Sequence, residues 1–248
     1  MFSNHLQKAV RLAESIQDSP SINSQEFLRL LEKASACCVL DSEEIAALIN
    51  GTKDKENQKL LLNFSSEQQR PHEREILLLP PLYFSSICEN RCLYCDFSSN
   101  GDRLSFQDFE DEVTELLHMG YRSIELVSSQ DPDLYVKTNG FNLETQFYKI
   151  NEVVKYFKTA AILIKKAGGG MLTSNIPPLD EGSFRKLKNA GLDCYLSWLE
   201  TFNPNQYSTL HDRNGPKYNQ PFRLDSFERA RQAGIEHLAG AFLKGLYD

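Results

Sequence analysis

Short apolar runs alternate with longer amphipathic stretches from residue 76 to the end of the sequence. Strands that are separated by helices pair in parallel, and the helices then cover the sheet. The alternation therefore predicts an α/β domain with about five βα units around a parallel sheet. The predicted strands are 75–84, 123–129, 171–176, 193–199 and 237–243, the predicted helices are 105–119, 143–166, 180–190 and 224–233, and a loop is predicted over 200–221.

The first 75 residues have a different character, because apolar side chains recur there at helical spacing. This spacing predicts an N-terminal helical extension over residues 1–75, followed by the α/β domain over residues 76–248. The polar stretch 52–75 is expected to be a partly helical connector. Cys37 and Cys38 are interpreted as small buried side chains. The other predicted helices of the extension are 4–18, 24–37 and 40–51.

Composition and charge narrow the classes of partner. The 248-residue chain carries a formal net charge of −7, whereas binding to nucleic acid requires a basic footprint. The longest apolar runs, such as 76–79 and 160–164, are too short to cross a bilayer. The first residues lack the basic and apolar regions of a secretion signal, so we expect a cytoplasmic protein with reduced thiols.

Three of the six cysteines fall within eight residues, with the spacing C-x3-C-x2-C. Cys88, Cys92 and Cys95 therefore lie on one short loop, directly after a predicted strand. Three thiolates on such a loop can bind three irons of a [4Fe–4S] cluster and leave the fourth iron open to a ligand that is not protein. This interpretation makes the three cysteines candidate metal ligands.

A zinc site and a disulfide framework are the other interpretations of the cysteine loop. A zinc site needs four ligands, so it would have to recruit His118, His211 or Cys194 from distant parts of the chain. A disulfide framework fits poorly with few, unevenly spaced cysteines in a chain without a secretion signal. The iron–sulfur interpretation is favoured, and the zinc-binding module remains an alternative.

Around the cysteines the chain resembles the radical S-adenosylmethionine (SAM) superfamily, whose signature is C-x3-C-x-aromatic-C. Cys88, Cys92, Tyr94 and Cys95 stand at the signature positions. The resemblance implies that the open iron binds the amine and carboxylate of SAM, and that Tyr94 packs beside the cluster. It also implies that an electron from the cluster cleaves SAM to methionine and a 5′-deoxyadenosyl radical, so the cofactors carry the chemistry.

Over about residues 22 to 248 the chain is similar to the aromatic amino-acid lyase branch, which contains the tyrosine lyases of thiazole synthesis (2-iminoacetate synthase) and of [FeFe]-hydrogenase maturation. That branch breaks the Cα–Cβ bond of tyrosine, giving dehydroglycine and p-cresol. The resemblance implies a partial TIM barrel, here incomplete because the chain ends after a fifth strand. The segments that carry it are 199–203, 207, 210–211, 215–217, 223–224, 229–230, 233–235 and 245–248.

The resemblance assigns two candidate catalytic residues that would also bind the cofactor. Glu200, at the mouth of the fourth predicted strand, matches a family glutamate and would face the ribose or the amino-acid end of SAM. Arg223 matches an arginine that reaches the SAM carboxylate, for which a forked donor is suited. His211 and Lys217 lie on the same loop and are interpreted as surface or loop-anchoring residues.

One departure from the family falls on the cofactor site. Ser128, Ser129 and Gln130 stand where the superfamily has a Gly-Glu element that receives the amino group of SAM. They remain candidate cofactor-binding residues, but an amide brings no negative charge to an ammonium group. Further departures from the Gln-Glu-Thr-Tyr-His motif of the branch are Leu199, Phe202 and Asn203.

The leading hypothesis is thus a radical SAM lyase that acts on tyrosine or a related aromatic amino acid, with a flavodoxin or ferredoxin as electron donor. The alternative is a degenerate or truncated relative that keeps the cluster and acts as a non-catalytic binding or scaffold protein. The altered Gly-Glu element and the early end of the chain motivate this alternative.

Overall fold

The computed structural model describes residues 21–36, 40–68, 77–138, 147–243 and 245. The predicted helix over 4–18 and the pair Cys37-Cys38 lie outside these residues. Contacts divide the chain into two compact units, with the division between Ile76 and Leu77. No helix in the described part of the chain is long and apolar enough to cross a membrane.

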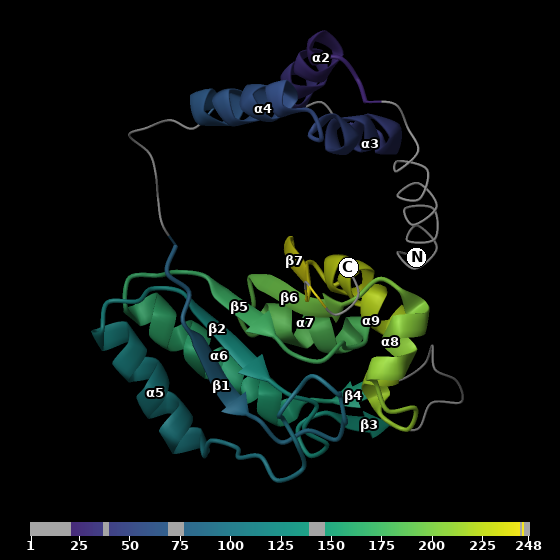
Figure 1. Cartoon of the computed structure of the whole chain (residues 1–248). Helices are drawn as coiled ribbons and strands as arrows, with labels where there is room; N and C mark the ends of the chain where they lie inside the picture. The colour runs from purple at the N-terminus through teal and green to yellow at the C-terminus, as the bar shows by residue number, and fades with distance from the viewer. Residues whose placement is uncertain (1–20, 37–39, 69–76, 139–146, 244, 246–248) are drawn as a thin grey trace. The chain divides into compact units, whose positions relative to one another are not determined.

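The helical unit contains α2 (Ser24–Ser35), α3 (Ser42–Gly51) and α4 (Lys55–Gln68), as Figure 1 shows. Asn23 caps α2 by accepting a hydrogen bond from the backbone N–H of Glu26, and Phe27 on α2 is fully buried. The buried Asn57 amide of α4 donates to the carbonyl oxygens of Ile22 (3.2 Å) and Gly51 (3.1 Å). This side chain therefore ties the start of α2 and the end of α3 to α4.

The second unit is built on five parallel strands, which confirms the predicted α/β class. The strand order follows the chain, so every crossover joins spatial neighbours (Figure 1). The strands, in spatial order, are β1 (Pro81–Ser85), β2 (Ile124–Ser128), β5 (Leu172–Asn175), β6 (Cys194–Glu200) and β7 (His237–Phe242), and the helices between them include α5 (Phe106–His118), α6 (Asn151–Lys166), α7 (Glu181–Asn189) and α10 (Ser226–Gln232).

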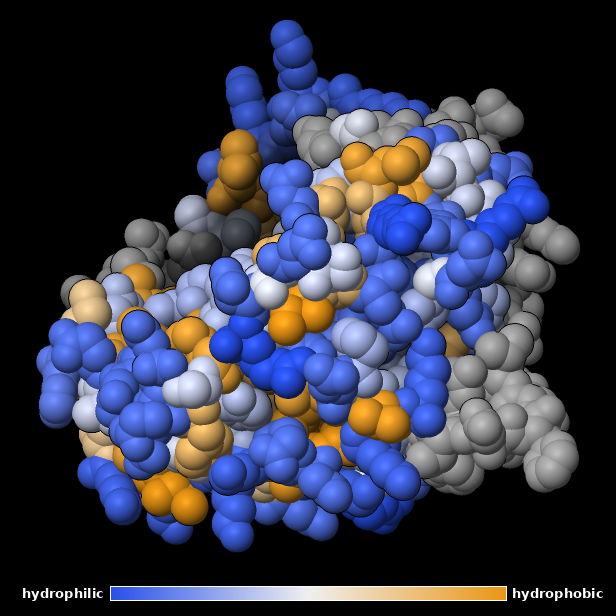
Figure 2. Space-filling model, turned by 90° about the horizontal axis from the view of Figure 1, so that it is seen from below, coloured by the Kyte–Doolittle hydropathy of each residue, from blue (hydrophilic) through white to orange (hydrophobic). Residues whose placement is uncertain are grey.

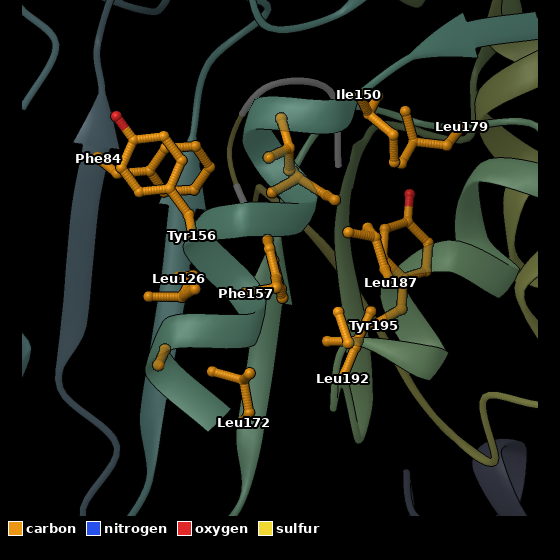
Figure 3. Packing of buried hydrophobic residues seen from close by; sticks show 14 of the residues in the cluster. Phe84, Leu126, Ile150, Tyr156, Phe157, Leu172, Leu179, Leu187, Leu192 and Tyr195 are labelled. Atoms are coloured by element: carbon orange, nitrogen blue, oxygen red, sulfur yellow. The ribbon is translucent and has the colours of Figure 1, made fainter. Parts of the chain in front are cut away.

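Alternate residues of the strands divide the sheet into a core face and a site face. Phe84, Leu126, Leu172 and Tyr195 belong to the buried core, where Figure 3 shows them beside side chains of α6 and α7 such as Phe157. Phe84 stacks on Tyr156 of α6 with ring centroids 5.0 Å apart. The residues of opposite parity line a cavity on the other face: Tyr83, Val127, Asn175 and Trp198.

Two boundaries differ from the sequence prediction. The strand expected over 75–84 begins only at Pro81, and Leu77 and Leu78 before it are 56% and 62% exposed. Pro80 and Pro81 lack the N–H groups that a strand would use. The helix expected from residue 143 begins at Asn151, because β4 (Phe147–Lys149) pairs antiparallel with β3 (Val136–Thr138).

The segment 200–221, which is expected to be a loop, contains regular secondary structure. It contains α8 (Pro204–Leu210), the 3₁₀ turn η2 (Pro216–Tyr218) and the start of α9 (Gln220–Leu224). Each of α8 and α9 begins with an Asn cap followed by an early proline, a combination that favours helix initiation. The helix predicted over 224–233 corresponds to α10, and α9 is an additional short helix within and just after the segment expected as a loop.

The core assignment predicts a large loss of stability for Phe157→Ala. Phe157 is fully buried among aromatic side chains, so we expect truncation to lower the free energy of unfolding by about 3–5 kcal/mol. Ile162→Ala on the same helix is the control, because Ile162 is 45% exposed and should cost at most about 1 kcal/mol. Guanidinium denaturation followed by circular dichroism measures both; equal losses would contradict the assignment.

Candidate active site

The carboxyl ends of the strands surround a cavity of about 290 Å³. Parallel strands deliver their following loops to one edge of the sheet, which is where such proteins bind ligands. Figure 2 views the molecule from below, the side toward which β1 and β2 point in Figure 1, and shows a mainly hydrophilic surface with scattered hydrophobic residues. All the site residues predicted from the sequence line this cavity: Cys88, Cys92, Tyr94, Cys95, Ser128, Ser129, Gln130, Glu200 and Arg223.

The cysteine loop is held in place by backbone hydrogen bonds. The Cys88 N–H donates to the Ser98 carbonyl oxygen (2.9 Å), and the Leu93 N–H donates to the Leu210 carbonyl oxygen (3.1 Å). All three loop cysteines are free thiols. Burial raises the pKa of Cys92, and the nearby Lys217 ammonium opposes this rise. The loop thus presents three thiols to one cavity beside a cation that favours a thiolate.

This arrangement fits an iron–sulfur cluster better than a zinc ion. Across the described residues, no group of three Cys, His, Asp or Glu side chains, the three loop cysteines included, is arranged to hold a single metal ion. Cys194 starts β6 and so lies at the opposite end of that strand from Glu200, and the exposed His118 is in the last turn of α5. The third residue that a zinc site could recruit, His211, has both ring nitrogens in hydrogen bonds. Three thiols around a larger cavity match a cluster, whose irons and sulfides lie between the ligands.

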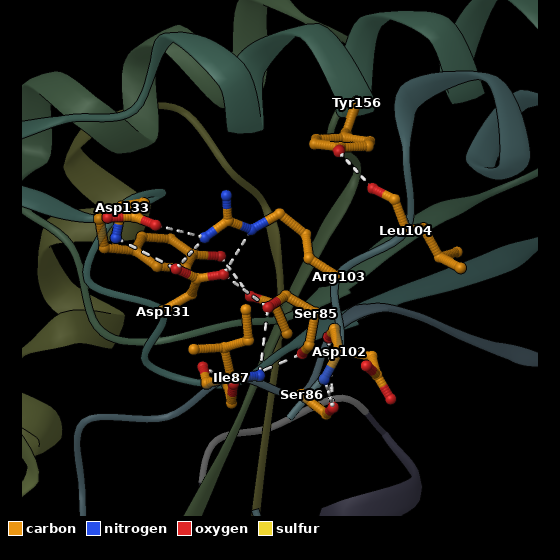
Figure 4. A network of polar contacts seen from close by, with 12 residues as sticks. Ser85, Ser86, Ile87, Asp102, Arg103, Leu104, Asp131, Asp133 and Tyr156 are labelled. Atoms are coloured by element: carbon orange, nitrogen blue, oxygen red, sulfur yellow. Dashed lines mark hydrogen bonds and ion pairs between the residues drawn. The ribbon is translucent and has the colours of Figure 1, made fainter. Parts of the chain in front are cut away.

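The Asp131 carboxylate, after β2, binds both the end of β1 and Arg103, which follows the cysteine loop, as Figure 4 shows. Arg103 donates to the fully buried Asp131 through Nε (2.8 Å) and Nη2 (2.6 Å), and the Ser85 hydroxyl donates to the same carboxylate (2.6 Å). Burial alone would raise the pKa of Asp131, but the hydrogen bonds from Arg103 and Ser85 outweigh it and lower this pKa. The neighbouring Gln130 carbonyl oxygen is thereby placed to accept from the Glu89 N–H (3.0 Å) on the cysteine loop.

The three residues at the altered Gly-Glu position behave differently from one another. The Ser128 hydroxyl shares a hydrogen bond with the Tyr135 hydroxyl, and the Ser129 hydroxyl donates to the Ile87 carbonyl oxygen. The hydroxyl groups of both serines therefore already form hydrogen bonds within the protein. Gln130 is buried, and its Nε2 lacks a partner in the described part of the chain. Of the three, Gln130 is the residue with an amide left for a ligand.

Arg223 also has a donor left for a ligand. Its Nη1 donates to the Ser197 hydroxyl (3.1 Å) and the Trp198 carbonyl oxygen (2.9 Å), which fixes the buried guanidinium. Its Nε is buried and lacks a partner among the described residues. A buried donor without an acceptor costs about 1–3 kcal/mol. Arg223 and Gln130 in one cavity therefore fit a ligand that carries a carboxylate.

Glu200, which is buried, and Lys217, which is partly buried, form an ion pair at the cavity wall. Lys217 Nζ lies 2.5 Å from Glu200 Oε1, and the side chain of Glu200 is only 3% exposed. Of the two roles expected for Lys217, a surface position is wrong, because its side chain lines the cavity, whereas the pair with Glu200 does anchor its loop. Burial lowers the pKa of Lys217, and Glu200 opposes that shift. Glu200 adopts a positive φ of 66°, an uncommon backbone state for a residue other than glycine and one often found at functional sites.

His211 anchors the loop that carries Lys217. Its Nδ1 donates to the Tyr207 carbonyl oxygen (2.7 Å), so its Nε2 accepts the hydroxyl proton of Tyr94 (2.7 Å). Burial lowers the pKa of His211 to about 4, which leaves the ring neutral at neutral pH. Tyr94 is thereby fixed at the cavity, and Lys217 Nζ lies 5.3 Å from the centre of its ring.

Several cavity residues were not assigned to the site from the sequence. Asn90 lies inside the cysteine loop, Asn175 ends β5, and Trp198 precedes Glu200 on β6. Two features of the sequence could have indicated further site residues. Asn90 stands between two cysteine ligands, and Lys217 belongs to the segment 215–217, which the family resemblance includes. The pairing of Lys217 with Glu200 had no signal in the local sequence.

A parallel sheet with three thiols at its carboxyl edge is the arrangement of an iron–sulfur protein on a partial (β/α) barrel. The family model of the radical SAM superfamily matches residues 82–246, so the chain belongs to this superfamily. Its members are enzymes that use a [4Fe–4S] cluster and SAM, act on small molecules and need a reductant.

The sequence identity to individual relatives is low. The chain is 23% identical to 2-iminoacetate synthase of Escherichia coli over 222 residues, which cover 88% of this chain and 54% of the synthase. It is 20% identical to 3-methylornithine synthase of Methanosarcina acetivorans, over 86% of this chain and 57% of that protein. The crystal structure of HydG, a maturase of the [FeFe]-hydrogenase, matches with a TM-score of 0.76 at 24% identity, over 98% of this chain and 51% of HydG. The chain thus spans about half the length of these proteins.

The Asp131 ion pair predicts a loss of stability for Asp131→Asn. This change leaves Arg103 without its buried partner, so the free energy of unfolding should fall by about 3 kcal/mol. Asp133→Asn is the matched control, because Asp133 contacts the same Arg103 (2.9 Å) but is 79% exposed and should cost at most about 1 kcal/mol. Guanidinium denaturation measures both variants, and equal losses would rule out a dominant role for the buried carboxylate.

The neutral state of His211 predicts a pH dependence of stability. The folded pKa of His211, about 4, lies below the ordinary value of 6.5, so between these values the unfolded chain binds the extra proton. The stabilising contribution is therefore complete above about pH 6.5 and is lost as the pH falls toward 4, by up to about 1.4 kcal/mol per pH unit. Denaturation at several pH values should show a shallower slope for His211→Gln; parallel slopes for the two proteins would contradict the prediction.

Proposed function

We propose that this chain is a radical SAM lyase that breaks the Cα–Cβ bond of tyrosine or a related aromatic amino acid, giving 2-iminoacetate (dehydroglycine) and p-cresol. The observation that carries the proposal is a single cavity in which three free thiols lie with two unpaired buried donors, Gln130 Nε2 and Arg223 Nε. The similarity to 2-iminoacetate synthase and to HydG supports the choice of this branch.

In this proposal Cys88, Cys92 and Cys95 hold the [4Fe–4S] cluster, and Tyr94 forms the wall beside it. When bound, the cluster and SAM supply reductive cleavage of the sulfonium to methionine and a 5′-deoxyadenosyl radical. The chain contributes the binding and orientation of both groups. The Tyr94–His211 hydrogen bond keeps the aromatic wall in one position beside the cysteines.

Recognition of the amino-acid part of SAM is assigned to Arg223 and Gln130. A guanidinium that is already fixed through Nη1 loses little freedom when its Nε binds a carboxylate, which strengthens the interaction. The Gln130 amide can accept from an ammonium group through its oxygen, without the charge of the usual glutamate. Glu200, held by Lys217, supplies the negative charge of the site and would face the ribose or the ammonium group.

The electron for the reaction would come from a small redox protein such as a flavodoxin or ferredoxin. A cytoplasmic location, where thiols stay reduced, remains the expectation from the sequence.

Anaerobic reconstitution with iron and sulfide tests the proposal. With dithionite, SAM and tyrosine, the chain should form 5′-deoxyadenosine and p-cresol, and Cys92→Ser should form neither because a cluster ligand is lost. Cys194→Ala is the matched control, since this buried cysteine starts β6 and does not line the cavity. It should keep the activity.

Three outcomes would oppose the proposal in different ways. A colourless, iron-free protein would remove the cluster, and zinc in its place would favour the zinc-binding module. A cluster whose spectrum SAM does not perturb would favour the non-catalytic scaffold. Formation of 5′-deoxyadenosine without p-cresol, with cleavage of another substrate, would refute the tyrosine assignment alone.

A further inference from the structure

We propose that Asn90 is a positioning residue that couples the cluster to the Glu200–Lys217 pair through the two ends of its amide. This inference rests on the cluster of the proposed function. Asn90 is buried within the cysteine loop, between two of the three ligands. Its Oδ1 accepts from the backbone N–H of Lys217 (2.9 Å), and its Nδ2 lies 3.7 Å from Cys88 Sγ.

The orientation of the Asn90 amide is fixed by chemistry. The Lys217 backbone N–H can only donate, so the amide atom that faces it must be the oxygen. The NH₂ group is consequently the end that faces Cys88. One side chain therefore contacts a ligand sulfur and a second loop at the same time.

The second loop, which carries Gly215 and Lys217, packs closely against Asn90. Gly215 lies so close to Asn90 that a Cβ atom at this position would be 2.8 Å from Asn90 Oδ1. The Tyr207 hydroxyl donates to the Lys217 carbonyl oxygen (2.6 Å), so the backbone of Lys217 is held on both sides. The Lys217 side chain then extends from a fixed point to Glu200 at the cavity wall. Moving Asn90 would therefore displace the partner of Glu200.

The NH₂ end of the Asn90 amide affects the reduction potential of the cluster. A hydrogen bond to a ligand sulfur stabilises negative charge, and the reduced cluster carries one more negative charge than the oxidised cluster. The Asn90 N–H therefore favours the reduced state and raises the reduction potential. The acceptor end supports the Glu200–Lys217 pair and through it the binding of SAM.

The experiment uses the reconstituted full chain and two readouts, the reduction potential of the cluster and the Kd for SAM from the perturbed cluster spectrum. Asn90→Ala should shift the potential to a more negative value and weaken SAM binding by about three- to tenfold, the range expected for one hydrogen bond. Gly215→Ala, which crowds the acceptor end directly and keeps the Asn90 NH₂ group as a donor, should weaken SAM binding with a smaller shift of the potential.

Asn100→Ala is the matched control, because Asn100 is an exposed asparagine that follows the cysteine ligands and does not line the cavity. It should leave both readouts unchanged. If Asn90→Ala does not assemble a cluster, Asn90→Asp, which keeps the oxygen for the Lys217 N–H, is compared with Asn100→Asp, and only the first should lower the potential strongly.

Equal potentials for the wild-type chain and the assembled Asn90 variant would overturn the coupling, as would an equal shift in the Asn100 control. Either result would leave the proposed function intact, because the wild-type chain would still hold its cluster. A wild-type chain that holds no cluster would refute the proposed function and this inference together.

Discussion

The carboxyl edge of the parallel sheet determines where everything else in the site lies. Each βα unit returns the chain to this edge, so β1 delivers the cysteine loop, β2 delivers Gln130 and β6 ends at Glu200. The register of the sheet is in turn fixed by core residues such as Phe84 and Leu126, because a slip by one residue would exchange the core face and the site face. The packing of the helices against the sheet is therefore what brings the functional side chains together.

Buried charge is the second constraint on the site. Asp131 and Glu200 are both removed from water, and each has a cation at hydrogen-bond distance. Such pairs gain little net stability over apolar packing, but they fix geometry strongly, because an unpaired partner would be costly. The pair at Asp131 sets the position of the cysteine loop, while the pair at Glu200 holds a carboxylate and an ammonium group in place at the cavity wall. The donors that remain unpaired, on Gln130 and Arg223, are the ones that a ligand can use.

The parts predicted well from the sequence are those encoded by neighbouring residues. The spacing of Cys88, Cys92 and Cys95 is local, and the alternation of strands and helices reports a repeated folding unit. The β3–β4 hairpin was missed because residues 147–149 continue the apolar pattern of α6, and only their pairing with Val136–Thr138 separates them from the helix. Lys217 was misjudged because its partner is 17 residues away, and their meeting depends on α8 and η2 folding the loop between them. Long-range contacts of this kind leave no periodic signal.

The central claim is that three cysteines hold a four-iron cluster whose remaining iron is open to SAM. Mössbauer spectroscopy of the chain reconstituted with ⁵⁷Fe tests it most directly. We expect a [4Fe–4S] spectrum in which SAM shifts the signal of about a quarter of the iron, because a single site gains new ligands. A spectrum of four irons that SAM leaves unchanged, or a preparation without iron, would contradict it.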